Sequence, residues 1–256
     1  DVVLLEKREN SIAVVTLNRP EQRNAVNPAV AHRLEAIVKA LEADPAVRVV
    51  VLTGAGGKVF SAGADLKVVA AGRVDDLMTA DGGFAGFVRA PRKKPWIAAV
   101  EGLALAGGCE LALACDLIVA AQDSAFGLPE VTRGLVAAAG GLFRLPKAIP
   151  LNVAREIILT AGRLPAEKAA AFGMVNRLAP SGTVLAEAVA LAGEIAANAP
   201  LAVQESLAIL ARVGTEPDEE MWRLSDAAIG RLKQSEDLIE GATAFVEKRA
   251  PVWKGR

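Results

Sequence analysis

The stretch WIAAVEGLALAGGCELALACDLIVAA, residues 96–121, carries the pattern that decides the fold. Its first five residues are apolar and suit a strand that is covered on both faces. A glycine-containing turn follows, and a helix is predicted to begin near Gly107. Leu117 to Ala121 is a second short apolar run. A strand, a helix and a further strand in this order indicate an α/β architecture with helices over a sheet.

The segments before and after this stretch extend the same pattern. Two apolar runs separated by residues 9–11 predict a β-hairpin near the N-terminus. A helix is expected from about Pro28 to Ala43, and the β-branched run from Val47 to Gly54 predicts another strand that is buried on both faces. From about Leu142 the sequence becomes mainly helical.

Two regions follow from this pattern. Residues 1–196 are expected to form the core, and residues 197–256 are expected to form an all-helical appendage. The segment from about Leu66 to Arg92 is weakly patterned, so no element is assigned to it.

Composition limits the possible functions. A formal net charge of −1 provides no general attraction for nucleic acid or for an anionic membrane. No long uncharged apolar run is present, and Cys109 and Cys115 resemble small buried hydrophobic residues, so a cytoplasmic protein is expected. His32 is the only histidine. A His-rich metal site therefore cannot form, and the helical pattern around His32 indicates a surface residue.

Two glycine-containing turns offer backbone N–H groups for binding negative charge. They lie in FSAGADL, residues 60–66, and in AGGCE, residues 106–110. The first N–H groups of a helix lack intrahelical partners, and the helix dipole favours an anion there. The N–H groups of Ala62 and Gly107 are thus candidates for an oxyanion hole. Alternatively, these small residues only let a helix and a strand pack closely.

Glu110 and Glu130 are the candidate catalytic carboxylates. Glu110 falls in the first turn of the helix that begins at Gly107, and its apolar neighbours favour burial. Glu130 follows Pro129 at what is predicted to be another transition from strand to helix. Each has the alternative interpretation of an ordinary first-turn acid that complements the helix dipole.

Six collinear blocks resemble the crotonase superfamily, the enoyl-CoA hydratase/isomerase family, over nearly the whole chain. They are LNRPEQRNAV, FSAGADL, AGGCELALACD, FGLPEVTRGLVAAAGGLFRLP, LTAGRLPAEKAAAFGMVNRL and EGATAFVEKRAPVWKGR. This resemblance implies an α/β crotonase (ClpP-like) spiral of ββα units with a C-terminal helical trimerisation region. A homotrimer, or a hexamer built as a dimer of trimers, is expected.

The resemblance also implies a reaction. Ala62 and Gly107 would form the oxyanion hole, Glu110 would act mainly as a base toward water, and Glu130 would deliver a proton to the α-carbon. The expected activity is reversible syn addition of water to a 2-trans-enoyl-CoA, with no metal or redox cofactor. Possession of both glutamates favours hydration, because isomerases commonly keep only one. Double-bond isomerisation, carnitinyl-CoA-type dehydration and, more distantly, non-catalytic RNA binding stay open.

Binding residues are implied in the same way. The nucleotide of CoA is expected near the N-terminal and FSAGADL blocks, with the C-terminal helix of a neighbouring subunit covering it. The implied residues are Arg23, Ala25, Ala62, Asp65, Leu66, Phe245 and Lys248. Arg23 would pair with phosphate. Phe84 and Phe87 are candidates for the acyl pocket or, alternatively, ordinary core residues.

One segment departs from many short-chain hydratases. GLVAAAGGLFRLP, residues 134–146, lacks the proline that those enzymes have after the corresponding glycine. In this respect the chain resembles members that process branched, carnitine-like or steroid side-chain acyl-CoAs.

Overall fold

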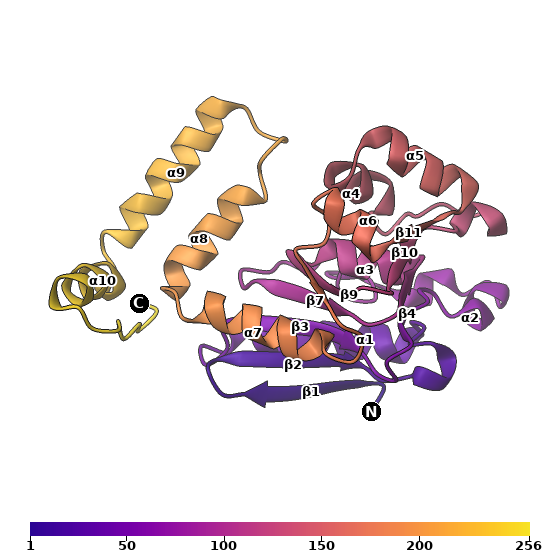
Figure 1. Cartoon of the computed structure of the whole chain (residues 1–256), viewed down its shortest axis with the longest axis horizontal. Coiled ribbons are helices and arrows are strands. Elements are labelled where there is room, and N and C mark those ends of the chain that lie inside the picture. Colours follow the sequence, from indigo (N-terminus) through magenta and orange to yellow (C-terminus); the bar gives the residue numbers. More distant parts are fainter.

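The apolar strands of the core pair into a six-stranded sheet in the computed structural model, which describes residues 1–256. The strand order is β1-β2-β3-β7-β9-β12 (Figure 1). The first two strands form the predicted antiparallel hairpin, and every other neighbouring pair is parallel. The strands are β1 (Val3–Arg8), β2 (Ile12–Leu17), β3 (Val49–Gly54), β7 (Trp96–Val100), β9 (Leu117–Ala121) and β12 (Arg177–Ala179).

A second sheet of four strands has the order β11-β10-β8-β4. Its strands are β4 (Val59–Ser61), β8 (Leu103–Leu105), β10 (Ala125–Gly127) and β11 (Arg163–Pro165). The pairs β3–β4, β7–β8 and β9–β10 each place one strand in the larger sheet and the next in the smaller one. A helical segment follows each pair, which is the repeated ββα unit that the family resemblance implies.

Helices cover both faces of the larger sheet (Figure 1). The helices of the core are α1 (Pro28–Ala43), α2 (Leu66–Ala70), α3 (Gly107–Ala114), α4 (Gly141–Ala148), α5 (Leu151–Thr160), α6 (Ala166–Ala171) and α7 (Val184–Ala196). Three 3-10 turns, η1 (Pro20–Gln22), η2 (Val74–Leu77) and η3 (Glu130–Arg133), complete the list. The weakly patterned segment holds α2, η2 and a two-stranded sheet of β5 (Met78–Thr79) and β6 (Gly83–Phe84).

Strand β3 shows how the sheet separates two apolar cores. Val50 and Leu52 belong to the larger core, which includes the buried face of α1. Val49 and Val51 belong to the smaller core, together with α7. Successive side chains of a strand point to opposite faces, so a continuous β-branched run is buried on both. The strand and the two-sided burial predicted here are confirmed.

The last three helices form an arm that projects from the core (Figure 1). They are α8 (Pro200–Leu210), α9 (Asp218–Leu232) and α10 (Glu236–Glu247). The division expected at residue 197 falls immediately after α7. The tail beyond α10 returns to the core, where Arg48 donates to the carbonyls of Ala196 at 3.0 Å and Trp253 at 3.1 Å.

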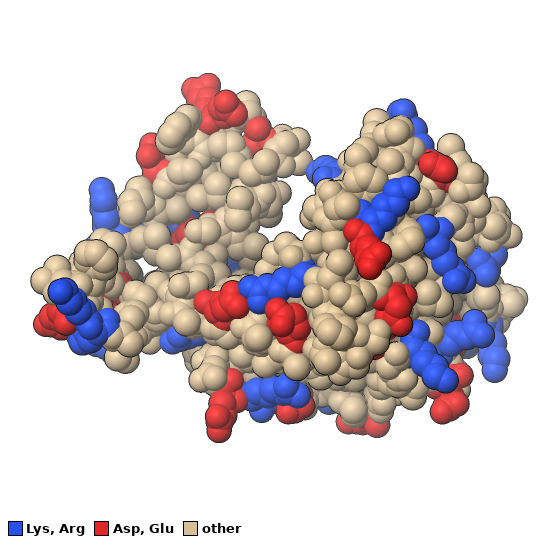
Figure 2. Space-filling model, in the orientation of Figure 1, with Lys and Arg blue, Asp and Glu red and all other residues tan.

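Charged side chains of both signs are interspersed on the face shown in Figure 2, and no large area of one sign is visible there. None of the helices is long and apolar enough by itself to cross a membrane. Helices α7 and α8 pass such a test only as a pair, and this pair is bent by 107°.

Candidate active site

The two candidate catalytic glutamates are both buried, which is unusual for a charged residue type. Glu110 is 3% exposed in the first turn of α3, and Glu130 is 9% exposed at the start of η3. Removing a carboxylate from water disfavours its charged form and raises its pKa. Burial is therefore the first physical property that separates these two residues from surface glutamates.

Glu110 is held by the backbone at the start of α4. The N–H of Gly141 donates to its Oε1 at 2.8 Å. Burial raises the pKa of Glu110 to about 7, and the negative charge of Glu130 adds to the increase. The N–H groups of Gly141 and Ala139 and the guanidinium of Arg144 act in the opposite direction. A carboxyl group with such a pKa exchanges protons readily near neutral pH.

Glu130 has a free hydrogen-bonding position. Its Oε2 is buried, and no protein group donates to it. Burial raises its pKa, while its own backbone N–H and the positive charge of Arg133 oppose that increase. A buried polar atom without a protein partner is unusual, and it suits a site that receives a polar ligand.

The FSAGADL turn presents one unpaired backbone N–H group, and it is not the predicted one. The N–H of Ala62 donates to the carbonyl of Arg23 at 3.0 Å. The N–H of Gly63 donates to the hydroxyl of Ser61 at 3.1 Å. By contrast, the N–H of Ala64 has no partner in the chain. The assignment of Ala62 as an oxyanion donor is therefore wrong for this conformation, because its N–H is already used.

The orientation of Ala64 follows from a short parallel ladder. Val26 donates to the carbonyl of Gly63 at 2.7 Å and accepts from the N–H of Asp65 at 2.8 Å. Because both bonds flank Ala64, its own N–H points to the other side. A methyl group at Gly63 would lie 2.5 Å from the amide nitrogen of Gly107, so the two turns are in close contact.

Gly107 supplies a second unpaired N–H at the N-terminus of α3. The preceding residue, Ala106, has a φ of +52°, a left-handed conformation that is uncommon for alanine. A Cβ at Gly107 would lie 2.5 Å from the ring of Phe84, so no larger residue fits. The N–H groups of Ala64 and Gly107 are thus adjacent and unpaired, in the arrangement that can stabilise an oxyanion.

Comparison with known proteins gives a consistent result. The family model for enoyl-CoA hydratase/isomerase matches residues 7–256. A carnitinyl-CoA dehydratase of Escherichia coli (strain K12) is 41% identical over 254 residues, with 97% of each chain covered.

Solved structures of two relatives cover the whole chain. An enoyl-CoA hydratase from Mycobacterium tuberculosis H37Rv is 49% identical with a TM-score of 0.94, covering 100% of this chain and 99% of that one. The chain belongs to the enoyl-CoA hydratase/isomerase family. A carnitinyl-CoA hydratase from Mycobacterium avium is 45% identical with a TM-score of 0.77, covering 100% of this chain and 99% of that one.

Membership of the enoyl-CoA hydratase/isomerase family confirms the resemblance and the crotonase fold class. It does not select one reaction, because the similar proteins carry both hydratase and dehydratase names. The residues of the site have to distinguish hydration from dehydration and isomerisation.

The structure brings together one group of the predicted CoA-binding residues. Arg23 is exposed and in contact with the FSAGADL turn, while Ala25 is buried beside it. Asp65 accepts from Arg19 at 3.1 Å and from the N–H of Lys67, so its carboxylate has structural partners. Leu66 is exposed.

Phe245 and Lys248 lie apart from that group. Phe245 is 85% exposed near the end of α10, and Lys248 is the C-cap of the same helix. Helix α10 lies at the far end of the arm from α2 and β4 (Figure 1). Within one chain these two residues lie apart from the other predicted CoA-binding residues, and their contribution to a neighbouring subunit stays a prediction.

The two candidate acyl-pocket residues have different environments. Phe84 packs against Gly107 beside the unpaired N–H groups. Phe87 is fully buried, makes an edge contact with Trp96 at 5.0 Å between ring centroids, and lies under the guanidinium of Arg92. Both rings belong to the larger core, and Phe84 is the better candidate for the acyl pocket because its ring lies beside Gly107.

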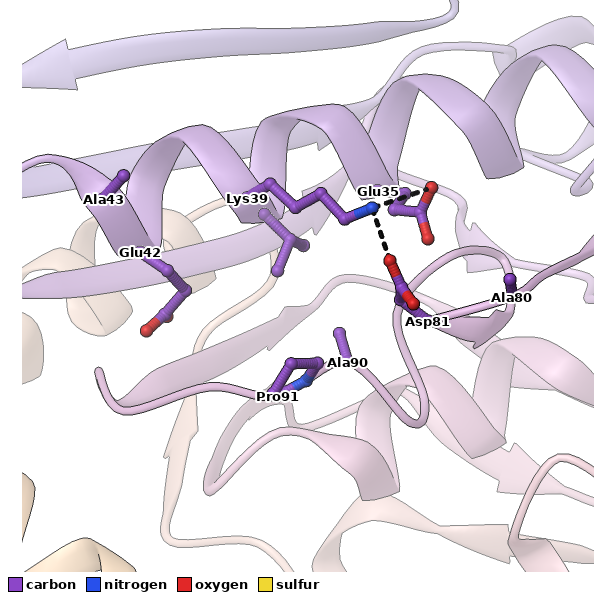
Figure 3. Close-up of a pocket in the computed structure, with 10 residues that line it drawn as sticks. Glu35, Lys39, Glu42, Ala43, Ala80, Asp81, Ala90 and Pro91 are labelled. Carbon is purple, nitrogen blue, oxygen red and sulfur yellow. Dashed lines mark hydrogen bonds and ion pairs between the residues drawn. The ribbon is translucent and has the colours of Figure 1, made fainter.

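A separate groove of about 600 Å³ lies between α1 and residues 80–91 (Figure 3). At its centre, Nζ of Lys39 is 2.7 Å from Asp81 and 3.6 Å from Glu35. None of the predicted site residues lines this groove. We assign it no part in the reaction.

Sequence reasoning missed three contributors to the site, namely Ala64, Gly141 and Arg144. The paired glycines at 140–141, at the start of an amphipathic helix, were a usable signal for available N–H groups. No comparable signal marks Ala64, because its availability depends on the ladder made by Val26.

Proposed function

We propose that the protein is an enoyl-CoA hydratase, a lyase that adds water reversibly to a 2-trans-enoyl-CoA and gives a 3-hydroxyacyl-CoA. The observation that carries the proposal is a pair of buried, electrostatically coupled carboxyl groups, Glu110 and Glu130. The unpaired N–H groups of Ala64 and Gly107 support it, since they suit a thioester oxygen that gains charge.

The raised pKa values suit a shared proton. Burial raises the pKa of both carboxyl groups, and the negative charge of Glu130 raises that of Glu110 further, so each holds a proton more readily than a surface glutamate does. Ionised Glu110 takes a proton from water as the oxygen attacks the β-carbon. Neutral Glu130 gives its proton to the α-carbon. Glu110 gains the proton that Glu130 loses, so the pair holds one proton before and after turnover.

The N–H groups of Ala64 and Gly107 would bind the enolate oxygen between these steps. They stabilise the transition state more than the substrate, because negative charge develops on that oxygen only during the reaction. The residues present account for these steps without a separate cofactor.

A second reaction of the same chemical type is dehydration of carnitinyl-CoA. It is favoured by the names of the curated relative from Escherichia coli and the solved relative from Mycobacterium avium. The same two carboxyl groups would run the steps in reverse. This alternative differs in the acyl group rather than in the catalytic residues.

The absorbance of the conjugated enoyl thioester tests the proposal. Wild type should consume crotonyl-CoA or a longer 2-enoyl-CoA, and Glu110→Gln and Glu130→Gln should each reduce kcat about 10²- to 10⁴-fold while CoA still binds. Glu167→Gln, an exposed residue of α6, is the matched control and should be fully active.

Further substrates separate the alternatives. Turnover of crotonobetainyl-CoA but of no unsubstituted 2-enoyl-CoA would replace the hydratase proposal with the dehydratase one. Conversion of a 3-enoyl-CoA without water addition would favour isomerisation. RNA binding that survives both glutamine substitutions, with no acyl-CoA turnover, would refute an enzymatic role.

A further inference from the structure

Arg144, on α4, is bonded to the loop that holds Glu110. Its Nη1 donates to the carbonyl of Ala139 at 3.0 Å. Two residues later, the N–H of Gly141 donates to the carboxylate of Glu110. The guanidinium therefore fixes the backbone whose N–H groups face the catalytic carboxylate.

The same guanidinium reaches a second segment of the site. Its Nη2 donates to the carbonyl of Val88 at 2.7 Å. Val88 follows Phe84, whose ring packs against Gly107. One side chain thus connects the loop that holds Glu110 to the segment beside the unpaired N–H groups.

Gly140 provides the space that this connection needs. A Cβ at Gly140 would overlap the guanidinium of Arg144, and the φ of Gly140 is +116°, which favours glycine. The glycine pair at 140–141 therefore serves the placement of Arg144 as well as the start of α4.

We propose that Arg144 is a positioning residue for Glu110, acting through the 139–141 backbone and through its charge rather than by contact with substrate. This inference rests on the proposed role of Glu110 as the base. Arg144 is partly buried on α4. Its guanidinium bonds the carbonyls of Val88 and Ala139, which are 51 residues apart in the sequence. A residue with only a local packing role would not need both bonds.

The charges around Glu110 set the sign of the expected effect. Glu130 on η3 raises the pKa of Glu110, whereas Arg144 on α4 lowers it. Cys109, the thiol neighbour on α3, is neutral because burial raises its pKa. Arg144 itself faces Arg89, Arg92 and Cys115 as well as Glu110. Loss of the Arg144 cation should therefore raise the pKa of Glu110 further and reduce its ionised fraction at neutral pH.

Three variants test the proposal. Arg144→Met should lower kcat about 10- to 100-fold and move the acid limb of the kcat profile to higher pH, with KM changed less than about threefold. Arg144→Lys keeps the charge but cannot form the forked pair of bonds, so its acid limb should stay nearer that of wild type. Lys147→Met removes an exposed charge from the same helix and should change neither kcat nor the position of the acid limb.

A titration without turnover provides an independent measurement. In infrared difference spectra, the protonated carboxyl band that Glu110→Gln abolishes should titrate at higher pH in Arg144→Met than in wild type. An unchanged titration in a folded variant overturns the proposal, and so does a fall in kcat with an unmoved acid limb. Should Arg144→Met fail to fold, Arg144→Lys decides, and wild-type kcat in that variant overturns the proposal. Failure of wild type to hydrate any acyl-CoA would refute the proposed function, but the titration would still test Arg144.

Discussion

Glu110 and Glu240 are the same residue type with opposite pKa shifts. Burial raises the pKa of Glu110 to about 7. The side chain of Arg249 and the N–H of Val252 lower the pKa of Glu240 to about 2. Glu240 is therefore a fixed negative charge near neutral pH, whereas Glu110 can both accept and release a proton there. Residue type alone does not determine which of the two can act as a base.

The raised pKa of Glu110 predicts how its replacement changes stability with pH. Its pKa is about 7 in the folded state and 4.5 as the ordinary value, so ionisation costs folded stability as pH rises through this range. The cost is absent below pH 4.5 and reaches roughly 3 kcal/mol above pH 7. Glu110→Gln should thus gain stability relative to wild type between pH 4.5 and pH 8. Urea unfolding at matched protein concentrations measures the difference, and one that stays constant across this range contradicts the prediction.

Helix α1 shows what a sequence predicts well at the scale of one element. Its predicted bounds, Pro28 to Ala43, are those of the structure. The side chain of Asn27 accepts from the N–H of Val30, and Pro28 occupies the first turn. A cap, a proline and an apolar face are all local signals, so they can be recognised without knowledge of the rest of the fold.

The residues of the site were predictable only in part, for a physical reason. Burial of Glu110 followed from its apolar neighbours, and the free N–H of Gly107 followed from its place at the start of a helix, whereas the burial of Glu130 was not predicted. The choice between Ala62 and Ala64 depends on bonds to a distant segment. Contacts of that kind leave no trace in the local pattern.

Among the side chains that hold the C-terminal tail, Asp237 is the most deeply buried. Asp237 is 3% exposed, and its two carboxylate oxygens accept from the N–H groups of Lys254 at 2.7 Å and Gly255 at 2.9 Å. Asp237→Ala removes both charge-assisted bonds and should cost about 2–3 kcal/mol. Amide hydrogen exchange should become faster in residues 249–256. Asp226→Ala, an exposed control on α9, should leave that exchange unchanged, and equal exchange in both variants would count against the prediction.

The arm exposes more apolar surface than a monomer is expected to keep. On α10, Leu238 and Ile239 are 46% and 70% exposed, and Phe245 and Val246, seven residues further on, are 85% and 79% exposed. A spacing of seven residues places these pairs on one face of the helix. A contiguous apolar face of this kind marks a protein contact. We propose that the arm mediates a homotrimer, which two trimers can extend to a hexamer.

Such an assembly would explain the distance between Phe245 and the rest of the CoA site, and subunit mixing tests it. Phe245→Ala combined with Lys248→Ala should raise KM for acyl-CoA about tenfold through lost contacts to the nucleotide, with kcat retained. Glu110→Gln chains are inactive but have an intact α10. In mixed oligomers, an active site on a Phe245/Lys248 variant chain next to a Glu110→Gln chain should recover the wild-type KM. Recovery requires that α10 serves a neighbouring site, because neither parent provides both parts. A mixture that shows only the raised KM would place these two residues outside the neighbouring site.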